Sequence, residues 1–215
     1  MMFRASLLSL FALLSLAPAA PAQVKVTANP ATTKTRTFSP RNPPKDMPPL
    51  KPGEAAVTES RFACGVQVIV EISSTPGQKP TCTITGIEAN LRLDVIIWLP
   101  TDTTPKIRAH EDGHRQISEV FYAHADSVAK DLSAKYVGRT LDINGTDKKD
   151  TQPAIERVAT EFCQEYLGAI EAPSQKVQER YDELTDHGRN RLAEKDAILR
   201  ARLAAPMPTT AKAGK

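Results

Sequence analysis

The chain has 215 residues, and its 28 lysines and arginines nearly balance its 25 aspartates and glutamates, which gives a net charge of +3. Charges of both signs are interspersed through the second half, so the composition gives no support to nucleic-acid or polyanion binding. After the N-terminal segment no second hydrophobic stretch follows, so we expect no stable membrane insertion of the mature chain.

The first 22 residues have the features of a secretory signal peptide. Arg4 precedes an apolar run from Leu7 to Leu16, which is far shorter than the roughly 20 residues that a transmembrane helix needs. Small residues ending in Ala20-Pro21-Ala22 supply a cleavage pattern. We therefore expect a protein exported to the periplasm or secreted, starting at Gln23, with a retained N-terminal membrane anchor as the alternative.

The next segment is rich in proline and poor in large apolar residues. Seven of the 17 prolines lie between Gln23 and Gly53, and such a composition cannot bury a core. We therefore expect a disordered Pro-rich linker at 23–56, one compact domain at 57–204 and a disordered tail at 205–215. Whether the linker is a propeptide, a spacer or a wall tether stays open.

Three runs rich in β-branched residues, separated by turn-forming residues, predict a small antiparallel sheet. The runs cover residues 65–72, 81–85 and 91–99. In the first run, apolar residues alternate with polar ones and predict one buried face, although Ile69 interrupts the alternation. The buried positions expected there are Val66, Val68, Val70 and Ile72.

Helices are expected to cover that sheet. Capping residues from Thr101 to Thr104, followed by Pro105, start the first helix, whose apolar positions recur three or four residues apart up to about Tyr136. Two further helices are expected at about 152–167 and 174–202, with a candidate interruption at His187-Gly188. Because the strands precede the helices, the order predicts an α+β fold.

Three cysteines, at positions 64, 82 and 163, leave at least one without an intrachain partner. Export would permit a disulfide. We favour Cys64–Cys82, which needs an asymmetric hairpin loop because Cys82 would otherwise face Glu71. A bridge from Cys163 to either of the others is the alternative. A cysteine zinc site is not expected, because no C-x-x-C spacing occurs.

The strongest chemical signal is His110-Glu111-Asp112-Gly113-His114. Histidines four residues apart lie one helical turn apart and can present ring nitrogens to one metal ion, for which zinc is favoured. Glu111 is rotated by about 100° from His110 on the helix, so its carboxylate can act as a general base without being a ligand. The alternative is that both histidines are ordinary core or surface residues.

A catalytic zinc site needs a third protein ligand. His124 follows His114 by ten residues on the same predicted helix and therefore lies about 15 Å away, so we expect it to serve in packing. His187 is our choice of third ligand. Acidic alternatives are Glu161, Glu165 and Asp186.

The sequence H-E-D-G-H-R-Q-I at 110–117, paired with Y-D-E-L-T-D-H-G at 181–188, resembles a bacterial family of predicted secreted zinc-dependent proteases, long described as a domain of unknown function. The resemblance covers about residues 57–195. It implies a zincin-like fold, a Zn²⁺ cofactor and a peptide or protein substrate.

Residue chemistry suggests further roles in and near these motifs. Tyr181 can offer its hydroxyl to an oxyanion, and Asp182 can accept a hydrogen bond from a ligand histidine. Gly188 lets the chain turn after His187. Gly113 indicates that another segment passes close to the helix, and the strand at 91–99 is our candidate for holding a substrate backbone.

We therefore expect a secreted zinc metallopeptidase with His110, His114 and His187 as ligands, Glu111 as general base and Tyr181 as oxyanion stabiliser. A non-catalytic zinc-binding envelope protein is the first alternative, and a closed four-ligand site would favour it. A zinc amidase acting on cell-wall material is the second, favoured by a narrow polar pocket instead of a strand-lined groove.

Overall fold

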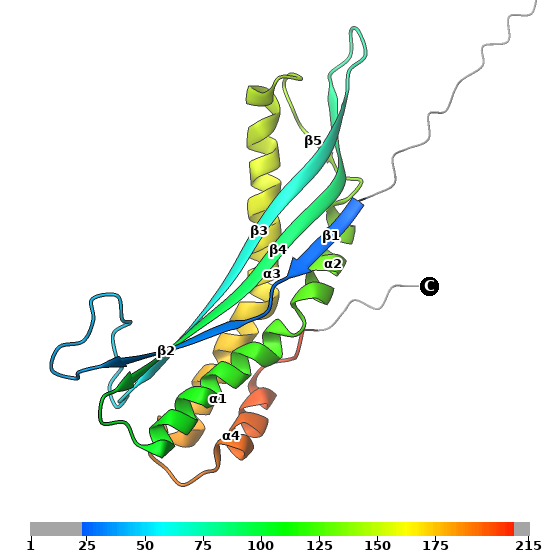
Figure 1. Ribbon diagram of the computed structural model, residues 1–215. Coiled ribbons are helices and arrows are strands. Elements are labelled where there is room, and N and C mark those ends of the chain that lie inside the picture. The colour runs from blue at the N-terminus through cyan, green and yellow to red at the C-terminus, as the bar shows by residue number, and fades with distance from the viewer. Residues whose placement is uncertain (1–22, 209–215) are drawn as a thin grey trace, which may run out of the picture.

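The computed structural model describes residues 23–208 (Figure 1). The predicted signal peptide at 1–22 and the part of the predicted tail at 209–215 lie outside the described residues. Within the described part of the chain, no helix is both long and apolar enough to cross a membrane.

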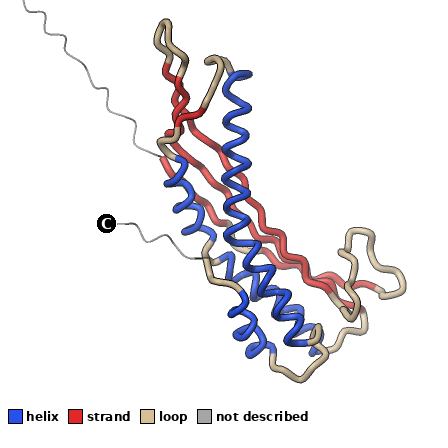
Figure 2. Tube along the Cα trace, turned by 180° about the vertical axis from the view of Figure 1, so that it is seen from behind, coloured by secondary structure: helices blue, strands red, loops and turns tan. Residues whose placement is uncertain are grey.

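Within residues 23–208, five strands and four α-helices form an elongated body in which the helices lie on one face of the sheet (Figures 1 and 2). The strands are β1 (Gln23–Ala28), β2 (Thr32–Phe38), β3 (Val57–Ser73), β4 (Thr81–Pro100) and β5 (Thr140–Leu141). The helices are α1 (Pro105–Tyr122), α2 (Ala125–Tyr136), α3 (Lys148–Thr185) and α4 (Glu194–Ala201), and a 3₁₀ turn, η1 (Arg202–Ala204), follows. This arrangement confirms a mixed α+β class.

The sheet is organised around β4. β3 pairs with β4 in antiparallel fashion along one edge, and β1 and β2 pair with successive parts of its other edge in parallel. The short β5 is antiparallel to the start of β4. The prediction of an all-antiparallel sheet is therefore wrong. β3 returns antiparallel after the long loop at 39–56, so β4 runs in the same direction as β1 and β2.

The prediction of a disordered linker is wrong for residues 23–38, which form β1 and β2. Most of their side chains are exposed, but their backbone pairs with β4 from Gly86 to Pro100. Parallel pairing satisfies backbone groups without burying large side chains. Composition reports side-chain burial and therefore missed these two strands.

The second and third predicted strands are one continuous strand. Val70 pairs with Ile84 and Ile69 pairs with Gly86, so Thr85 is an extra residue and forms a β-bulge. The bulge shifts the alternation of buried side chains from even to odd positions. Buried residues are Cys82 and Ile84 before it, and Ile87, Ala89, Leu91, Leu93, Val95 and Ile97 after it. This change of phase made one strand resemble two.

Two helix boundaries differ from the prediction. The first predicted helix is divided into α1 and α2 at Ala123–His124, which lets α2 pack on β1 and β4. The second and third predicted helices are instead joined in α3, which continues through Pro173. A buried stripe faces the core on both sides of this proline, and its packing outweighs the local cost. The stripe comprises Phe162, Tyr166, Ile170, Ser174, Val177 and Tyr181.

The interruption predicted at His187-Gly188 is present, because α3 ends at a left-handed Asp186 and α4 begins at Glu194. The tail prediction is wrong for its first residues. Ala205 is buried and Met207 packs against the core, so the chain stays folded after α4.

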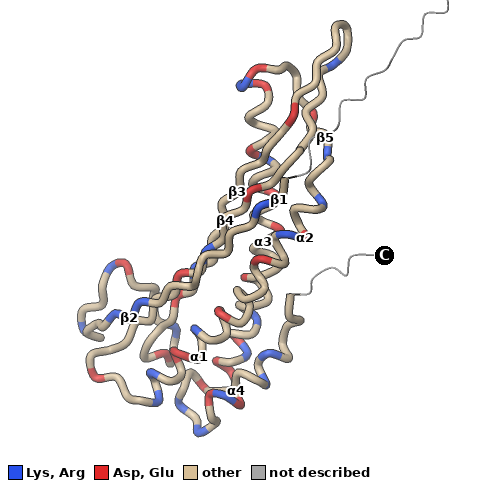
Figure 3. The backbone as a smooth tube through the Cα atoms, turned by 45° about the vertical axis from the view of Figure 1, so that its right-hand side comes forward, with Lys and Arg blue, Asp and Glu red and all other residues tan. Residues whose placement is uncertain are grey.

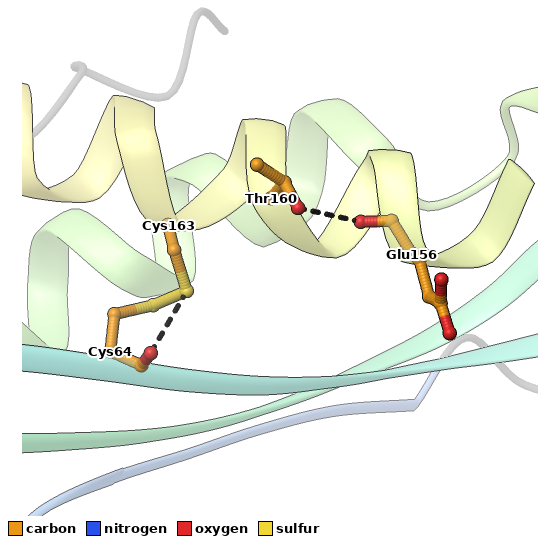
Figure 4. Close-up of a disulfide and its surroundings, with 4 residues drawn as sticks. All are labelled: Cys64, Glu156, Thr160 and Cys163. Carbon is orange, nitrogen blue, oxygen red and sulfur yellow. Dashed lines mark hydrogen bonds between the residues drawn. A yellow bond between two sulfur atoms is a disulfide. The ribbon is translucent and has the colours of Figure 1, made fainter. Parts of the chain in front are cut away.

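One disulfide ties the sheet to the longest helix (Figure 4). It joins Cys64 in β3 to Cys163 in α3 with the Cα atoms 5.5 Å apart, and Cys82 is free and buried. The favoured Cys64–Cys82 pairing is therefore wrong. Cys64 lies opposite Leu91 in the hairpin, nine residues along β4 from Cys82, which is a separation of about 30 Å.

Candidate metal centre

The candidate site lies where α1 packs between β3 and α3. As predicted, α1 begins with Thr104, whose hydroxyl oxygen accepts a hydrogen bond from the Ile107 amide at 3.2 Å, followed by Pro105. His110 and Glu111 are 3 % and 4 % exposed on the buried side of this helix. Local sequence thus sets the helix, and packing against α3 encloses the motif.

Three metal-binding atoms converge at the site. The Nε2 atoms of His110 and His114 are 3.1 Å apart. One carboxylate oxygen of Asp182, Oδ1, lies 2.9 Å from the His114 Nε2 and 3.3 Å from the His110 Nε2. Together these residues form a buried cluster that could hold a metal ion.

The other ring nitrogen of each histidine has a partner that fixes its tautomer. His114 Nδ1 contacts Gln178 Oε1, and the Gln178 amide donates to the His114 carbonyl at 3.0 Å, so its oxygen must face the ring. His110 Nδ1 lies 3.4 Å from the Thr185 hydroxyl, which itself donates to the Tyr181 carbonyl at 2.7 Å. Both Nδ1 atoms therefore act as donors, which leaves the Nε2 atoms available to a metal ion when the rings are neutral.

These donors fit a divalent ion. When both histidines are neutral, which is the protonation state that binds a metal ion, the cluster of His110, His114 and Asp182 presents three ligand atoms within 3.3 Å of one another. Tetrahedral ligation at about 2.0–2.1 Å places ligand atoms about 3.3 Å apart. The observed separations match that spacing.

The two carboxyl groups at the centre have opposite environments. Burial raises the pKa of Glu111, and the neighbouring histidines and the Thr58 hydroxyl oppose this shift only in part. Burial also acts to raise the pKa of Asp182, but its contacts with His110 and His114 outweigh it and hold the pKa well below its usual range. Asp182 is therefore a fixed negative charge, whereas Glu111 can take up a proton.

Several residues of the site were missed by sequence reasoning. Asp182 lies within the cluster that could hold a metal ion and not outside it as expected, and Gln178 and Thr185 contact the outer ring nitrogens of the histidines. Together with Tyr181 they lie three, four and seven residues apart in α3 and so share one face. That spacing was readable from the sequence. Thr58, which donates to Glu111 Oε2 at 2.8 Å, carried no such signal.

The structure places the other candidate ligands differently. His187 Nδ1 lies 3.7 Å from Asp182 Oδ1 and belongs to a second cluster with Glu54, so its role as third ligand stays a prediction. The acidic alternatives point elsewhere. Glu161 pairs with Arg139, Glu165 accepts from Tyr136, and Asp186 binds Arg189. His124 precedes α2 and belongs to neither cluster.

Tyr181 lies beneath the site. Its ring stacks on His110 with centroids 4.9 Å apart, and its hydroxyl donates to Glu194 at 3.1 Å and to the His110 carbonyl at 3.3 Å. This geometry favours a role in positioning His110. The catalytic role of Tyr181 stays a prediction, with its hydroxyl engaged on α4 in this structure.

Gly113 is explained by Tyr181 and not by a passing strand. A Cβ atom at this position would lie 2.2 Å from the Tyr181 hydroxyl oxygen, and the fully buried ring has no space to move. We expect Gly113→Ala to lower the free energy of unfolding by about 1–3 kcal/mol, despite the better helix propensity of alanine. Thermal melting would measure this loss.

Gly168→Ala is the matched control, since a Cβ there meets nothing within 4 Å. Alanine at that α3 position should stabilise the protein by up to about 1 kcal/mol. Equal stabilisation by both variants would contradict the close approach of Tyr181 to α1.

The centre opens into a cavity of about 270 Å³. β3 lines one wall with residues such as Val57, Thr58 and Ser60, and α3 lines another with Gln175 and Gln178. The strand at 91–99, proposed to hold a substrate backbone, is the second half of β4, and it pairs with β3 on one side and, from Asp94 onward, with β2 on the other. That prediction is wrong. In the described residues β3 pairs with β4 alone, so β3 is the edge strand beside the site.

The chain matches no protein-family model, no curated protein and no solved structure. The resemblance to predicted secreted zinc-dependent proteases, and with it the zincin-like fold, therefore stays an expectation based on two motifs. The function is therefore inferred from the geometry of the cluster and the cavity beside it.

Proposed function

We propose that this protein is an exported zinc-dependent metallopeptidase. The observation that carries the proposal is the meeting of two histidine Nε2 atoms and the Asp182 carboxylate beside the buried Glu111, at the wall of an open cavity. Two imidazole nitrogens and one carboxylate oxygen are ligands that suit Zn²⁺.

His110, His114 and Asp182 would hold the ion. His187 lies next to this group, with its Nδ1 atom 3.7 Å from Asp182 Oδ1. Zinc bound there would supply Lewis-acid activation of a water molecule and of the substrate carbonyl. Glu111 would remove a proton from the water as it attacks the carbonyl and then deliver that proton to the leaving amine. Its raised pKa suits both halves of this transfer.

Neighbouring residues keep these groups in place. Thr58 from β3 donates to one carboxylate oxygen of Glu111, which orients the base. Gln178 and Thr185 from α3 fix the tautomers of the two histidines. Because contacts from both β3 and α3 hold them, the general base and the metal-binding histidines would keep their relative positions during turnover.

The shape of the cavity supports an extended peptide as substrate. Its wall includes the start of β3, an edge strand whose unpaired backbone groups can form main-chain hydrogen bonds with a peptide. A small cell-wall amide would not need such a strand. A closed four-ligand site would favour the non-catalytic alternative, and the two acids named as examples of a fourth ligand, Glu161 and Asp186, pair with arginines.

Two features support an exported protein that does not bind nucleic acid. The Cys64–Cys163 disulfide suits an oxidising compartment. Figure 3 shows Lys and Arg interspersed with Asp and Glu along the described chain, whereas nucleic-acid-binding proteins typically gather basic residues on one face.

The proposal is tested by metal-dependent cleavage of an unfolded protein such as casein. We expect the zinc-loaded protein to produce peptide fragments, a chelator to stop cleavage and added zinc to restore it. Absence of cleavage from the zinc-loaded protein, together with hydrolysis of peptidoglycan fragments, would instead support the amidase.

Asp182→Asn tests the ligand set directly. Replacing the charged oxygen donor removes one ligand and a negative charge, so we expect zinc affinity to fall by at least about 10–100-fold. Competition with a chromophoric chelator measures this change. The control is Asp186→Asn, which lies four residues further along, just after α3, and whose side chain binds Arg189. Unchanged affinity in Asp182→Asn would rule out Asp182 as a ligand.

A further inference from the structure

A second cluster of metal-binding atoms adjoins the first. Glu54, Asp182 and His187 each present one donor atom, and these atoms all lie within 4.8 Å of one another. His187 Nδ1 is 3.7 Å from Asp182 Oδ1 and 3.9 Å from Glu54 Oε1. The same Asp182 oxygen contacts His114 at 2.9 Å, so one carboxylate belongs to both clusters.

Glu54 is held in place by its own loop. Its Oε2 accepts a hydrogen bond from the Lys51 amide at 2.7 Å, and the left-handed Gly53, with φ of 92°, lets the chain turn just before it. A Cβ on Gly53 would lie 2.9 Å from the guanidinium of Arg189. The loop before β3 is therefore packed against the loop after α3. The second oxygen of Glu54 faces His187.

His187 is directed into the cluster by an unusual backbone. Asp186 and His187 both have left-handed conformations, with φ of 50° and 52°, followed by Gly188 at 77°. Left-handed backbone at two residues that are not glycine is strained and persists where the surroundings require it. The His187 Nδ1 atom is nevertheless buried without a hydrogen-bond partner. Buried polar atoms nearly always have a binding partner, so an unpaired ring nitrogen between two carboxylates indicates that a cation binds there.

Charge balance points in the same direction. Four carboxylates, those of Glu54, Glu111, Glu171 and Asp182, line the cavity. Within the described chain, Glu54 forms an ion pair with Lys51 at 3.8 Å, and that lysine side chain is 68 % exposed. One divalent ion would compensate two of these four charges, and a second ion would compensate the other two.

We propose that Glu54, Asp182 and His187 hold a second divalent cation, with Asp182 shared between the two ions. This inference rests on the proposed function for the first ion. Ligand separations of 3.7 and 3.9 Å are within a few tenths of an ångström of those around one ion with bonds of about 2.0–2.3 Å. The second ion would also link the loop at 39–56, through Glu54, to the segment that follows α3, through His187.

The test is metal stoichiometry in the full protein, measured by elemental analysis after zinc saturation and desalting. We expect about two ions per chain in the wild type, as in known two-metal sites. Glu54→Gln, which can keep the Lys51 hydrogen bond, and His187→Ala should each retain about one. Asp186→Asn, next to His187 but bonded to Arg189, should retain both.

Cobalt titration followed by visible absorption separates the two sites without any activity assay. The wild type should show two binding steps, and Glu54→Gln and His187→Ala should lose one of them. Saturation of the wild type at a single ion would overturn the second site while leaving the proposed peptidase intact, provided that ion supports cleavage. Failure to bind any ion would overturn both proposals. Two ions retained in both variants would show that other residues hold the second ion.

Discussion

Glu111→Gln is expected to reduce peptide hydrolysis by about 10²–10⁴-fold, the usual contribution of a general base, while the zinc content stays unchanged. The amide has the size of the carboxylate and can still accept the hydrogen bond from Thr58, but it cannot take up a proton. Glu111 lies outside both clusters of metal-binding atoms, so its loss leaves the ligands in place. Cleavage rates and elemental analysis on the same preparation would measure both quantities.

The same variant should be at least as stable as the wild type in its metal-free form. Because burial raises the pKa of Glu111 in the folded protein, ionisation of this group above its ordinary pKa costs folding free energy. Glutamine removes that cost at neutral pH, and thermal melting with a chelator present would detect the gain. Loss of activity without loss of stability separates a catalytic role from a structural one.

Glu119→Gln provides the control for Glu111. Glu119 lies on the same helix, two turns further along, and its carboxylate binds Arg115 at the surface. Turnover and zinc content should both match the wild type. Wild-type cleavage by the Glu111→Gln protein would eliminate the assignment of Glu111 as the base.

Removing the disulfide should cause the largest change in stability. Cys64 and Cys163 are separated by 99 residues, and cross-linking a loop of that length restricts the unfolded chain by up to about 4.7 kcal/mol. Removal of a native disulfide typically costs about 2–5 kcal/mol, so we expect the Cys64→Ala, Cys163→Ala double variant to lose that amount. Urea denaturation of the two proteins would measure the difference.

Cys82 supplies the control and an independent check of the pairing. It is buried in β4, and burial raises the pKa of its thiol, so it should react with thiol reagents only after unfolding. Unfolding without a reductant should then expose one free thiol. Three reactive thiols would contradict the Cys64–Cys163 bridge.

The sequence by itself determined the local chemistry. The spacing of His110 and His114 placed two imidazoles on one turn of a helix, and the Thr104 and Pro105 signals set where that helix begins. These features depend on residues within one or two turns of each other, which is the range over which helix geometry is fixed. The motif and its helix could therefore be predicted without knowing what packs against them.

Sequence patterns gave less information about the sheet. Residues 23–38 were missed because parallel pairing with β4 satisfies their backbone while their side chains stay exposed. The bulge at Thr85 shifted the pattern of burial and made one strand resemble two. In both cases the deciding contacts join residues about 60 or 16 positions apart, which alternation within a single run does not report.

Only the tertiary structure decided how the centre is completed. Which side chains approach the two α1 histidines depended on how α3 crosses α1, and that crossing brings Asp182 to within 2.9 Å of His114. Glu54 reached the same place through a loop that composition assigned to a linker. A ligand set joins elements more than 50 residues apart, so its geometry is fixed by packing of the whole domain and not by the spacing inside any one motif.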